Sequence, residues 1–317
     1  MRTFLDFEKP VSDLEGQIQE LRRLEGGDSV SVGDEIKALE EKARDALAVI
    51  YARLTPWQKA QVARHPDRPH ASRYIAGMFQ DFTPLGGDRK FGDDKAIIAG
   101  LARFHGEPVA ILCQEKGDDT QGRLAHNFGM ARPEGYRKAV RVMELADRYA
   151  LPVIALVDTA GAYPGVGAEE RGQAEAIARS TEACLGLKAP NISVIIGEGG
   201  SGGAIAIATA NQVFMLEHAI YSVISPEGAA SILWRDPTRA QDAATAMKIT
   251  AADLLALKVI DRIIPEPLGG AHRDPDMAIV RTEGAIATAL AELGGIPGPE
   301  LVRLRREKFL AIGRSIS

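Results

Sequence analysis

A run of seven residues, 197–203, constrains the fold of this chain more than any other feature, because five of them are glycine. The run follows an apolar, β-branched stretch at 192–196 that predicts a buried strand. It precedes residues 204–208, whose alanine and isoleucine side chains predict the start of a closely packed helix. Glycine lets backbone N–H groups approach a ligand without a Cβ atom in the way, and a helix start adds a positive dipole end. The pattern therefore predicts a site that holds negative charge with main-chain donors.

Three kinds of site share this spacing. The first, third and sixth residues of the run spell G-x-G-x-x-G, and Glu217 lies about 20 residues further on, as in dinucleotide-binding proteins. The third to seventh residues spell G-x-S-x-G, the nucleophile elbow of serine hydrolases, with Ser201 as the nucleophile. In the third kind, the N–H groups of Gly202 and Gly203 stabilise a developing oxyanion. A tight turn that only packs a helix against a sheet is the remaining alternative.

The rest of the sequence weighs on these alternatives without deciding between them. Only about two helical turns fit between Gly203 and Gln212, which weakens the dinucleotide interpretation because that fold needs a longer crossover helix. A serine hydrolase needs a histidine and an acid. His272, preceded by Asp253 or Asp261, would supply them in the chain order of α/β-hydrolases.

Composition narrows the class of protein. The chain has 317 residues, of which 45% are hydrophobic and 26% charged, as in an ordinary globular protein. A net charge of −5 gives no reason to expect a nucleic-acid partner. The only two cysteines, Cys113 and Cys184, exclude a disulfide scaffold and a cysteine-only zinc site and suit a reducing compartment. No apolar run reaches membrane-spanning length and the N-terminus lacks signal-peptide features, so we expect a cytoplasmic protein without membrane contact.

The first part of the chain differs from the rest. Apolar residues at helical spacing predict two helices separated by a break at residues 26–29, which together form a helical hairpin over residues 1–55. The two stripes are Val11, Leu14, Ile18 and Leu21, and then Ile36, Leu39, Ala43, Ala46, Ile50 and Leu54. A basic, proline-containing turn follows at residues 64–70. We favour a solvated loop there over one that faces an anion.

From Lys95 onward the sequence alternates between strand and helix patterns. A second glycine-rich loop, residues 159–167, follows a predicted strand at 151–158 and precedes a predicted single helix at 168–187. Because both glycine-rich loops share one plan of strand, loop and helix, the sequence favours stacked β-β-α units. Residues 56–275 are predicted to form this α/β domain. Residues 276–317 are predicted to form C-terminal helices.

A series of stretches, in order along nearly the whole chain, resembles the alpha-subunit family of bacterial acetyl-CoA carboxylase carboxyltransferases. These stretches are residues 4–8, 63–66, 127–130, 133–139, 158–173, 196–204, 221–228 and 264–273. Two departures stand out. Ala160 replaces the usual proline of the family, and Gln114-Glu115 replaces the usual His-Gln before Lys116.

The resemblance implies a crotonase-like superhelix of β-β-α units that carries half of an active site. It implies transfer of a carboxyl group from carboxybiotin to acetyl-CoA, which gives malonyl-CoA in the first committed step of fatty-acid biosynthesis. Biotin would arrive on a biotin carboxyl carrier protein within an ATP-dependent complex that includes biotin carboxylase. The other half of the site would come from a zinc-containing beta subunit in an alpha2-beta2 heterotetramer, so no metal is expected in this chain.

The resemblance also implies site residues. Gly202 and Gly203 would be the catalytic donors on the biotin side, where a side chain at Gly203 is expected to slow the reaction far more than it destabilises the protein. No side-chain nucleophile is then required. The alternatives are a serine hydrolase that uses Ser201 and a non-catalytic assembly subunit. The substrate-binding residues would be Gly161, Ala162, Tyr163, Gly165, Gly199, Gly200 and Ser201.

Overall fold

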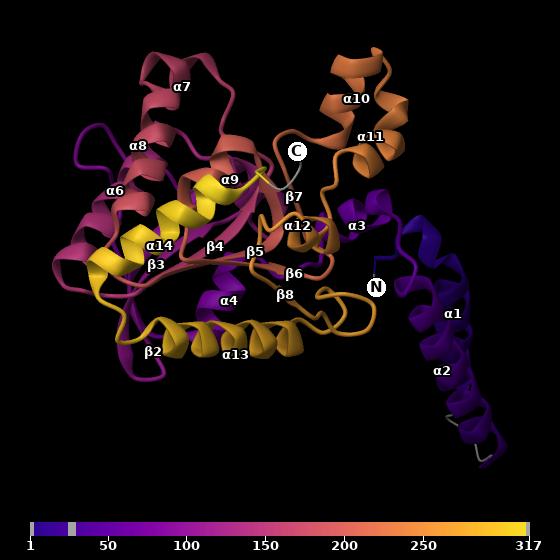
Figure 1. Ribbon diagram of the computed structural model, residues 1–317. Coiled ribbons are helices and arrows are strands. Elements are labelled where there is room, and N and C mark those ends of the chain that lie inside the picture. The colour runs from indigo at the N-terminus through magenta and orange to yellow at the C-terminus, as the bar shows by residue number, and fades with distance from the viewer. Residues whose placement is uncertain (1–2, 25–29, 315–317) are drawn as a thin grey trace.

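The computed structural model describes residues 3–24 and 30–314, which form a mixed α/β fold around one eight-stranded sheet (Figure 1). The strand order is β1-β2-β3-β4-β5-β6-β8, and β7 pairs with the end of β5. The predicted α/β fold class is confirmed. The strands are β1 (Gln80–Pro84), β2 (Ile97–Phe104), β3 (Glu107–Gln114), β4 (Val153–Thr159), β5 (Asn191–Gly200), β6 (Gln212–Leu216), β7 (Ile220–Ser222) and β8 (Arg262–Ile264).

The central strands are parallel and fully covered. Strands β1, β2 and β3 pair antiparallel, whereas β3, β4, β5, β6 and β8 run parallel. Every residue of β4 and β5 is buried, as expected for parallel strands with helices on both faces. On one face pack α6 (Pro133–Arg148), α8 (Gln173–Gly186) and α9 (Ser201–Ala208), and on the other α4 (Ala71–Met78) and α13 (Pro275–Leu293) (Figure 1). The carboxyl ends of β4 and β5 therefore meet at one edge, and each leads into a glycine-rich segment.

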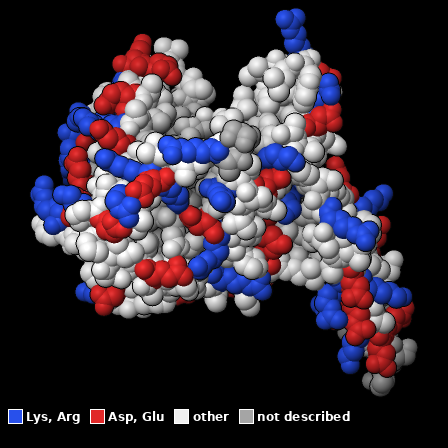
Figure 2. All heavy atoms as spheres, in the orientation of Figure 1, with Lys and Arg blue, Asp and Glu red and all other residues white. Residues whose placement is uncertain are grey.

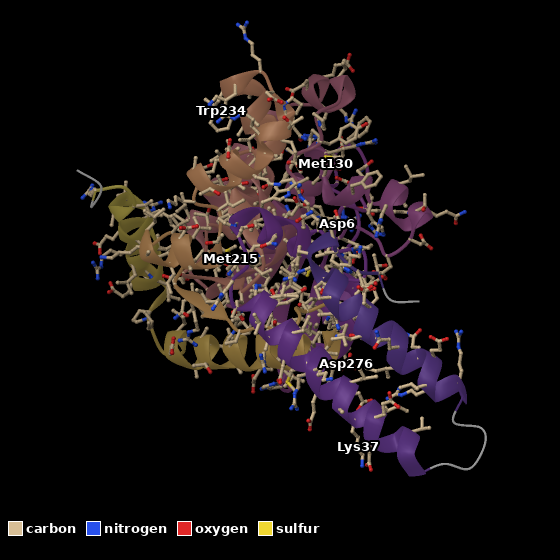
Figure 3. All side chains as sticks on the ribbon, turned by 90° about the vertical axis from the view of Figure 1, so that its right-hand side faces the viewer. Asp6, Lys37, Met130, Met215, Trp234 and Asp276 are labelled. Atoms are coloured by element: carbon tan, nitrogen blue, oxygen red, sulfur yellow. The ribbon has the colours of Figure 1, made fainter. Side chains whose placement is uncertain are left out.

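The N-terminal helical hairpin is confirmed. Helices α1 (Lys9–Leu24) and α2 (Val30–Tyr51) pack along each other and project from the body of the molecule (Figure 1). Figure 3 shows Lys37 toward the free end of this hairpin and Asp6 where it meets the body. The predicted break at 26–29 falls within residues 25–29, outside the described residues.

Three further groups of helices complete the fold. Helix α3 (Pro56–Ala63) begins with Thr55 as its N-cap, and α14 (Gly298–Ala311) follows α13 as a predicted C-terminal helix. Helices α10 (Pro226–Trp234) and α11 (Ala240–Ala246) form a lobe that carries Trp234 at one end of the molecule (Figure 3). The remaining helices are α5 (Thr120–Ala125), α7 (Val166–Glu170), α12 (Ala251–Ala256) and the 3-10 helices η1 (Asp6–Glu8), η2 (Asn127–Gly129) and η3 (Pro237–Arg239).

The division of the chain into domains at residues 55 and 275 remains a prediction.

Two local expectations are wrong. The single helix predicted at 168–187 is two helices, α7 and α8, because Gly172 between them has a left-handed φ of 81°. The turn at 64–70 is not a solvated loop: Arg68 is buried and its Nη2 atom lies 2.6 Å from Oε1 of Glu266. Within residues 3–24 and 30–314, no helix is both long enough and apolar enough to cross a bilayer.

Candidate functional site

In chain order, residues 159–167 form the first glycine-rich segment and residues 197–203 the second. The second segment is a direct passage from strand to helix, not a loop. Strand β5 continues through Gly200 and α9 begins at Ser201, whose φ of 53° makes the sharp turn between them. The first N–H groups of any helix lack an intrahelical acceptor, and Gly200 at the N-cap has no side chain to supply one. The N–H groups of Gly202 and Gly203 are therefore donors at the positive end of α9, as the oxyanion interpretation requires.

The two glycine-rich segments lie backbone against backbone. A Cβ atom at Gly200 would overlap the carbonyl group of Ala160, and one at Gly203 would lie 2.6 Å from the carbonyl carbon of Gly161. The same atom at Gly203 would lie 2.8 Å from the nitrogen of Ala162. Predicted site residues from both segments therefore do come together. Only glycine fits at these contacts, since backbone atoms cannot swing aside as a side chain can.

This contact corrects the expectation for Gly203. A side chain there would collide with the protein's own backbone, so its effect on stability would be large rather than small. Gly202 differs, because a Cβ atom at that position would contact only Ile177, at 3.4 Å. A substitution at Gly202 is therefore compatible with the fold.

The other predicted residues are held by aromatic neighbours. A Cβ atom at Gly165 would overlap the ring of Tyr163, and one at Gly199 would lie 2.7 Å from the ring of Tyr221. The Tyr163 ring in turn lies under the guanidinium of Arg132, with 4.6 Å between the Arg132 Cζ atom and the ring centroid. Tyr163 thus packs within the first segment.

Side chains, rather than close backbone packing alone, hold the first segment in shape. The Thr159 hydroxyl donates to the carbonyl of Gly161 (2.7 Å) and accepts from its N–H group (3.1 Å). The Gln173 side-chain amide donates to the carbonyl oxygens of Ala131 and Tyr163, both at 2.9 Å. These bonds hold in place the part of the first segment that packs against the second segment at Gly161.

Beneath both segments lies a buried charged cluster that sequence reasoning missed. The Lys116 Nζ atom lies 2.9 Å from Oδ1 of Asp158 and 2.7 Å from Oε2 of Glu198. The other oxygen of Asp158 lies 3.0 Å from Nδ1 of His70, and Arg64 Nε donates to Oε1 of Glu198 at 2.6 Å. The signal was present in the sequence: Asp158 directly follows a buried apolar strand run and Glu198 follows another after one glycine, and a buried charge needs a partner.

The cluster favours the charged forms of Asp158, Glu198 and Lys116. Burial by itself would raise the pKa of Asp158, but the charge of Lys116 and the hydrogen bond from His70 outweigh it and lower the pKa below 3.8. Burial is likewise outweighed at Glu198, where Lys116 and Arg64 lower the pKa below 4.5. The same two carboxylates raise the pKa of Lys116 despite its burial.

Gln114, one of the departures from the family pattern, also reaches the site. Its side-chain amide donates to the carbonyl oxygen of Gly203 at 2.7 Å, and both groups are buried. Glu115 accepts hydrogen bonds from Ser72 and from the N–H of Gly117 instead. A donor at position 114 therefore anchors the first turn of α9.

A cavity of about 270 Å³ opens beside this cluster. Ala160, the other departure, forms part of its wall, and Phe128 lies at its rim in a left-handed conformation with a φ of 55°. In its wall, Glu198 forms ion pairs with both Arg64 and Lys116. The lining residues are Ala63, Arg64, His65, Pro66, His70, Lys116, Arg123, Phe128, Ala160 and Glu198.

The dinucleotide interpretation does not survive the geometry. Gly197 and Gly199 lie inside β5 rather than at a turn before a helix, so they cannot cradle a pyrophosphate. Helix α9 has 8 residues, the short crossover that the spacing predicted. The carboxylate of Glu217 accepts the N–H of Glu266 at 3.1 Å.

The hydrolase interpretation lacks a base. The turn at Ser201 has the shape of an elbow, but its hydroxyl forms no hydrogen bond with any residue in the described parts of the chain. The ring of His272 stacks on His65, with 3.8 Å between centroids, and that of His218 packs on Tyr51. His70 pairs with Asp158 in the wall of a cavity that Ser201 does not line.

Among the residues with described positions, no group of three or more histidine, cysteine, aspartate or glutamate side chains is arranged to hold a metal ion. Both cysteines are free and buried. Burial raises the pKa of the Cys184 thiol to about 12, so this thiol is not poised to ligate a metal or act as a nucleophile.

Solved structures with the same fold include carboxyl-transferring and decarboxylating enzymes. A transcarboxylase 12S chain, described with methylmalonyl-coenzyme A bound, aligns with a TM-score of 0.59 at 21% identity, covering 71% of this chain and 41% of that one. A chain of a Pseudomonas malonate decarboxylase hetero-tetramer aligns with a TM-score of 0.56 at 20% identity, covering 72% and 92%. These likenesses confirm the crotonase-like carboxyltransferase fold.

Sequence comparisons reach the family. Residues 4–313 match the family described as "Acetyl co-enzyme A carboxylase carboxyltransferase-like". The acetyl-coenzyme A carboxylase carboxyl transferase subunit alpha of Xanthobacter autotrophicus is 67% identical over 317 residues, and that of Chelativorans sp. is 68% identical; each alignment covers 100% of both chains. With matches along its whole length and the carboxyltransferase fold, this chain belongs to the alpha-subunit family of acetyl-CoA carboxylase carboxyltransferases.

Proposed function

We propose that this chain supplies the biotin-side half of a carboxyltransferase active site, at the junction of β5 and α9. The complete enzyme transfers a carboxyl group from carboxybiotin to acetyl-CoA and forms malonyl-CoA for fatty-acid biosynthesis. The observation that carries the proposal is the pair of N–H donors at Gly202 and Gly203, held rigid by the contact of Gly203 with Gly161.

The donors act by binding charge as it develops. The N–H groups of Gly202 and Gly203 lie at the positive end of an eight-residue helix, where the helix dipole favours an oxyanion. Removal of one such donor typically lowers turnover by a factor of roughly 10² to 10³. Gly161, Ala162 and Gly200 keep the donors in place by close packing, and no side chain of this chain has to act as a nucleophile.

The donor set fits biotin. When bound, biotin supplies the carboxyl group to be transferred, and its ureido oxygen is the acceptor that two neutral N–H donors suit. No acidic side chain lies within α9, whose residues are small or apolar, so nothing there repels a negative charge. We propose that the biotin is carried by a biotin carboxyl carrier protein and loaded by biotin carboxylase, and that zinc belongs to the beta subunit.

The surface around the site supports a partner subunit. Figure 2 shows a notch between the α7–α8 side and the α10–α11 lobe, with surface around it that is mostly neither acidic nor basic. The elements on its two sides carry exposed apolar side chains: Val166 in α7 is 76% exposed, Ile232 in α10 is 71% exposed, and Val223, between β7 and α10, is 74% exposed. Such a concentration is typical of a protein interface. We propose that the beta subunit docks here, in an alpha2-beta2 assembly in the cytoplasm.

A mixing experiment tests the function. The chain alone is expected to form no malonyl-CoA, and addition of the beta subunit with carboxybiotin is expected to start its formation. Hydrolysis of activated esters by the chain alone, with labelling of Ser201 by a fluorophosphonate, would favour the hydrolase alternative instead. A folded, assembled but inert mixture would favour a non-catalytic assembly subunit. Ser201→Ala is the matched control and is expected to keep most of the transfer rate.

A further inference from the structure

A single ammonium group ties together the two residues from which the glycine-rich segments start. Asp158 directly precedes the first segment and Glu198 lies within the second, one residue before Gly199. Lys116 Nζ contacts both carboxylates, at 2.9 Å and 2.7 Å. Oδ1 of Asp158 also accepts the N–H of Glu198 at 2.9 Å, so the two segments are joined at their origin.

The same short stretch of chain holds the far end of the second segment. Gln114, two residues before Lys116, donates to the carbonyl of Gly203. Lys116 therefore fixes the entry to Gly199–Gly203 through Glu198, while Gln114 fixes its exit. Neither side chain contacts the N–H groups of Gly202 and Gly203, so both act on them only through the backbone.

We propose that Lys116 is a positioning residue for carboxyl transfer, which sets the separation of the two glycine-rich segments and so the aim of the Gly202 and Gly203 donors. This inference rests on the proposed function and adds a residue to it. Without the ammonium group, the buried carboxylates of Asp158 and Glu198 repel each other across the very contact that joins the segments. His70 would still face Asp158, and Arg64 would still face Glu198.

The test compares Lys116→Met with Lys308→Met in the complex with the beta subunit. Lys308 is a matched control on α14: its side chain is 20% exposed against 14% for Lys116, and its Nζ atom lies 2.7 Å from Asp261 and 2.8 Å from the carbonyl of Asn211. Lys116→Met is expected to lower kcat by roughly tenfold to a hundredfold, part of the loss typical for a removed donor, with KM for acetyl-CoA nearly unchanged. Lys308→Met is expected to keep kcat within about twofold.

Two further measurements separate positioning from general damage. Because unpaired neighbouring carboxylates raise each other's pKa, lowering the pH from about 8 to about 6 should restore part of the turnover of Lys116→Met relative to wild type. Lys116→Arg keeps the positive charge and should recover more turnover than Lys116→Met at every pH. If Lys116→Met does not fold, its combination with Glu198→Gln, which removes the like-charge pair, is measured in its place.

Amide hydrogen exchange at Gly199–Gly203 identifies which inference fails. Faster exchange there together with the loss of kcat supports the role of Lys116. Unchanged exchange with normal kcat in the folded variant would overturn that role. Faster exchange with normal kcat would instead overturn the assignment of the glycine donors in the proposed function, because their aim would then not matter. No transfer activity in the wild-type complex would refute the proposed function itself.

Discussion

The two glycine-rich segments share a sequence pattern of strand, glycine-rich stretch and helix, but different interactions hold them in place. In the second, β5 passes straight into α9, whose N-cap Gly200 makes no side-chain cap bond, and Gly200 and Gly203 pack closely against the backbone of the first segment. In the first, the chain makes an irregular turn whose shape depends on side-chain bonds from Thr159 and Gln173. The comparison teaches that one segment carries the proposed N–H donors, while the other is the backbone surface against which that segment packs.

The largest change in stability is expected from substitutions in the charged cluster beneath the two segments. Asp158→Asn removes one of the two carboxylate partners of Lys116 and the carboxylate that faces His70, and it should lower the free energy of unfolding by about 3–5 kcal/mol. Glu198→Gln should cost less, because Arg64 keeps a second partner in Glu227. Urea unfolding of both variants measures the difference. Equal losses would contradict the unequal roles.

The same acids set the pH dependence. Both carboxyl groups have lowered pKa values in the folded protein, so their stabilisation is complete above the ordinary values of 3.8 and 4.5 and is lost as the pH falls toward the folded values. The free energy of unfolding of the wild type should fall between about pH 5 and pH 3. Asp158→Asn should show a flatter curve over that window.

A smaller effect is expected at the contact between the segments. Gly203→Ala places a methyl group 2.6 Å from the Gly161 carbonyl carbon and should cost about 1–3 kcal/mol of stability. Gly284→Ala, in α13, is the matched control, since a Cβ atom there has no neighbour within 4 Å among the described residues. It should stabilise by about 0.5–1 kcal/mol. Thermal unfolding of both measures the opposite signs.

The stability of the first segment should depend on a side chain rather than on a glycine. Thr159→Val keeps the shape of the buried residue but removes both hydrogen bonds to Gly161, so it should cost about 1 kcal/mol. The variant should also expose Gly161 to faster amide exchange. A cost equal to that of Gly203→Ala would show that the two segments are held in the same way.

The smallest effect is expected at Gly202. Its methyl group would meet only Ile177, at 3.4 Å, so Gly202→Ala should change the free energy of unfolding by less than about 0.5 kcal/mol. A loss as large as that of Gly203→Ala would show that the whole segment, and not particular contacts, demands glycine. The comparison needs only thermal unfolding on matched preparations.

Local patterns predicted much of this architecture. The apolar run at 192–196 forms the buried centre of β5, and the N-cap side chains of Thr55, Ser225 and Thr250 each accept a hydrogen bond from the first turn of their helix. These features depend on neighbouring residues alone. The two helices α7 and α8 were missed because the break at Gly172 depends on a left-handed φ that many glycines do not adopt.

The site was harder to predict because its parts are distant in the chain. The glycines that carry the donors are visible in the sequence, but the contact of Gly200 with Ala160 spans two strands. Lys116 follows β3, and its link to Asp158 and Glu198 exists only once β3, β4 and β5 lie side by side. The turn at 64–70 was misjudged since charge was taken as a sign of exposure, whereas Arg68 is buried opposite Glu266.

The backbone contact between Ala160 and Gly200 has a consequence for chimaeric enzymes. Because no side chain separates the two segments there, their paths cannot be adjusted to each other by repacking. A graft of residues 159–167 from a relative with proline at position 160 would make the first segment more rigid while leaving the second segment, which packs against it, unchanged. We therefore expect the two segments to be exchangeable only as one cassette, together with Gln114 and Lys116.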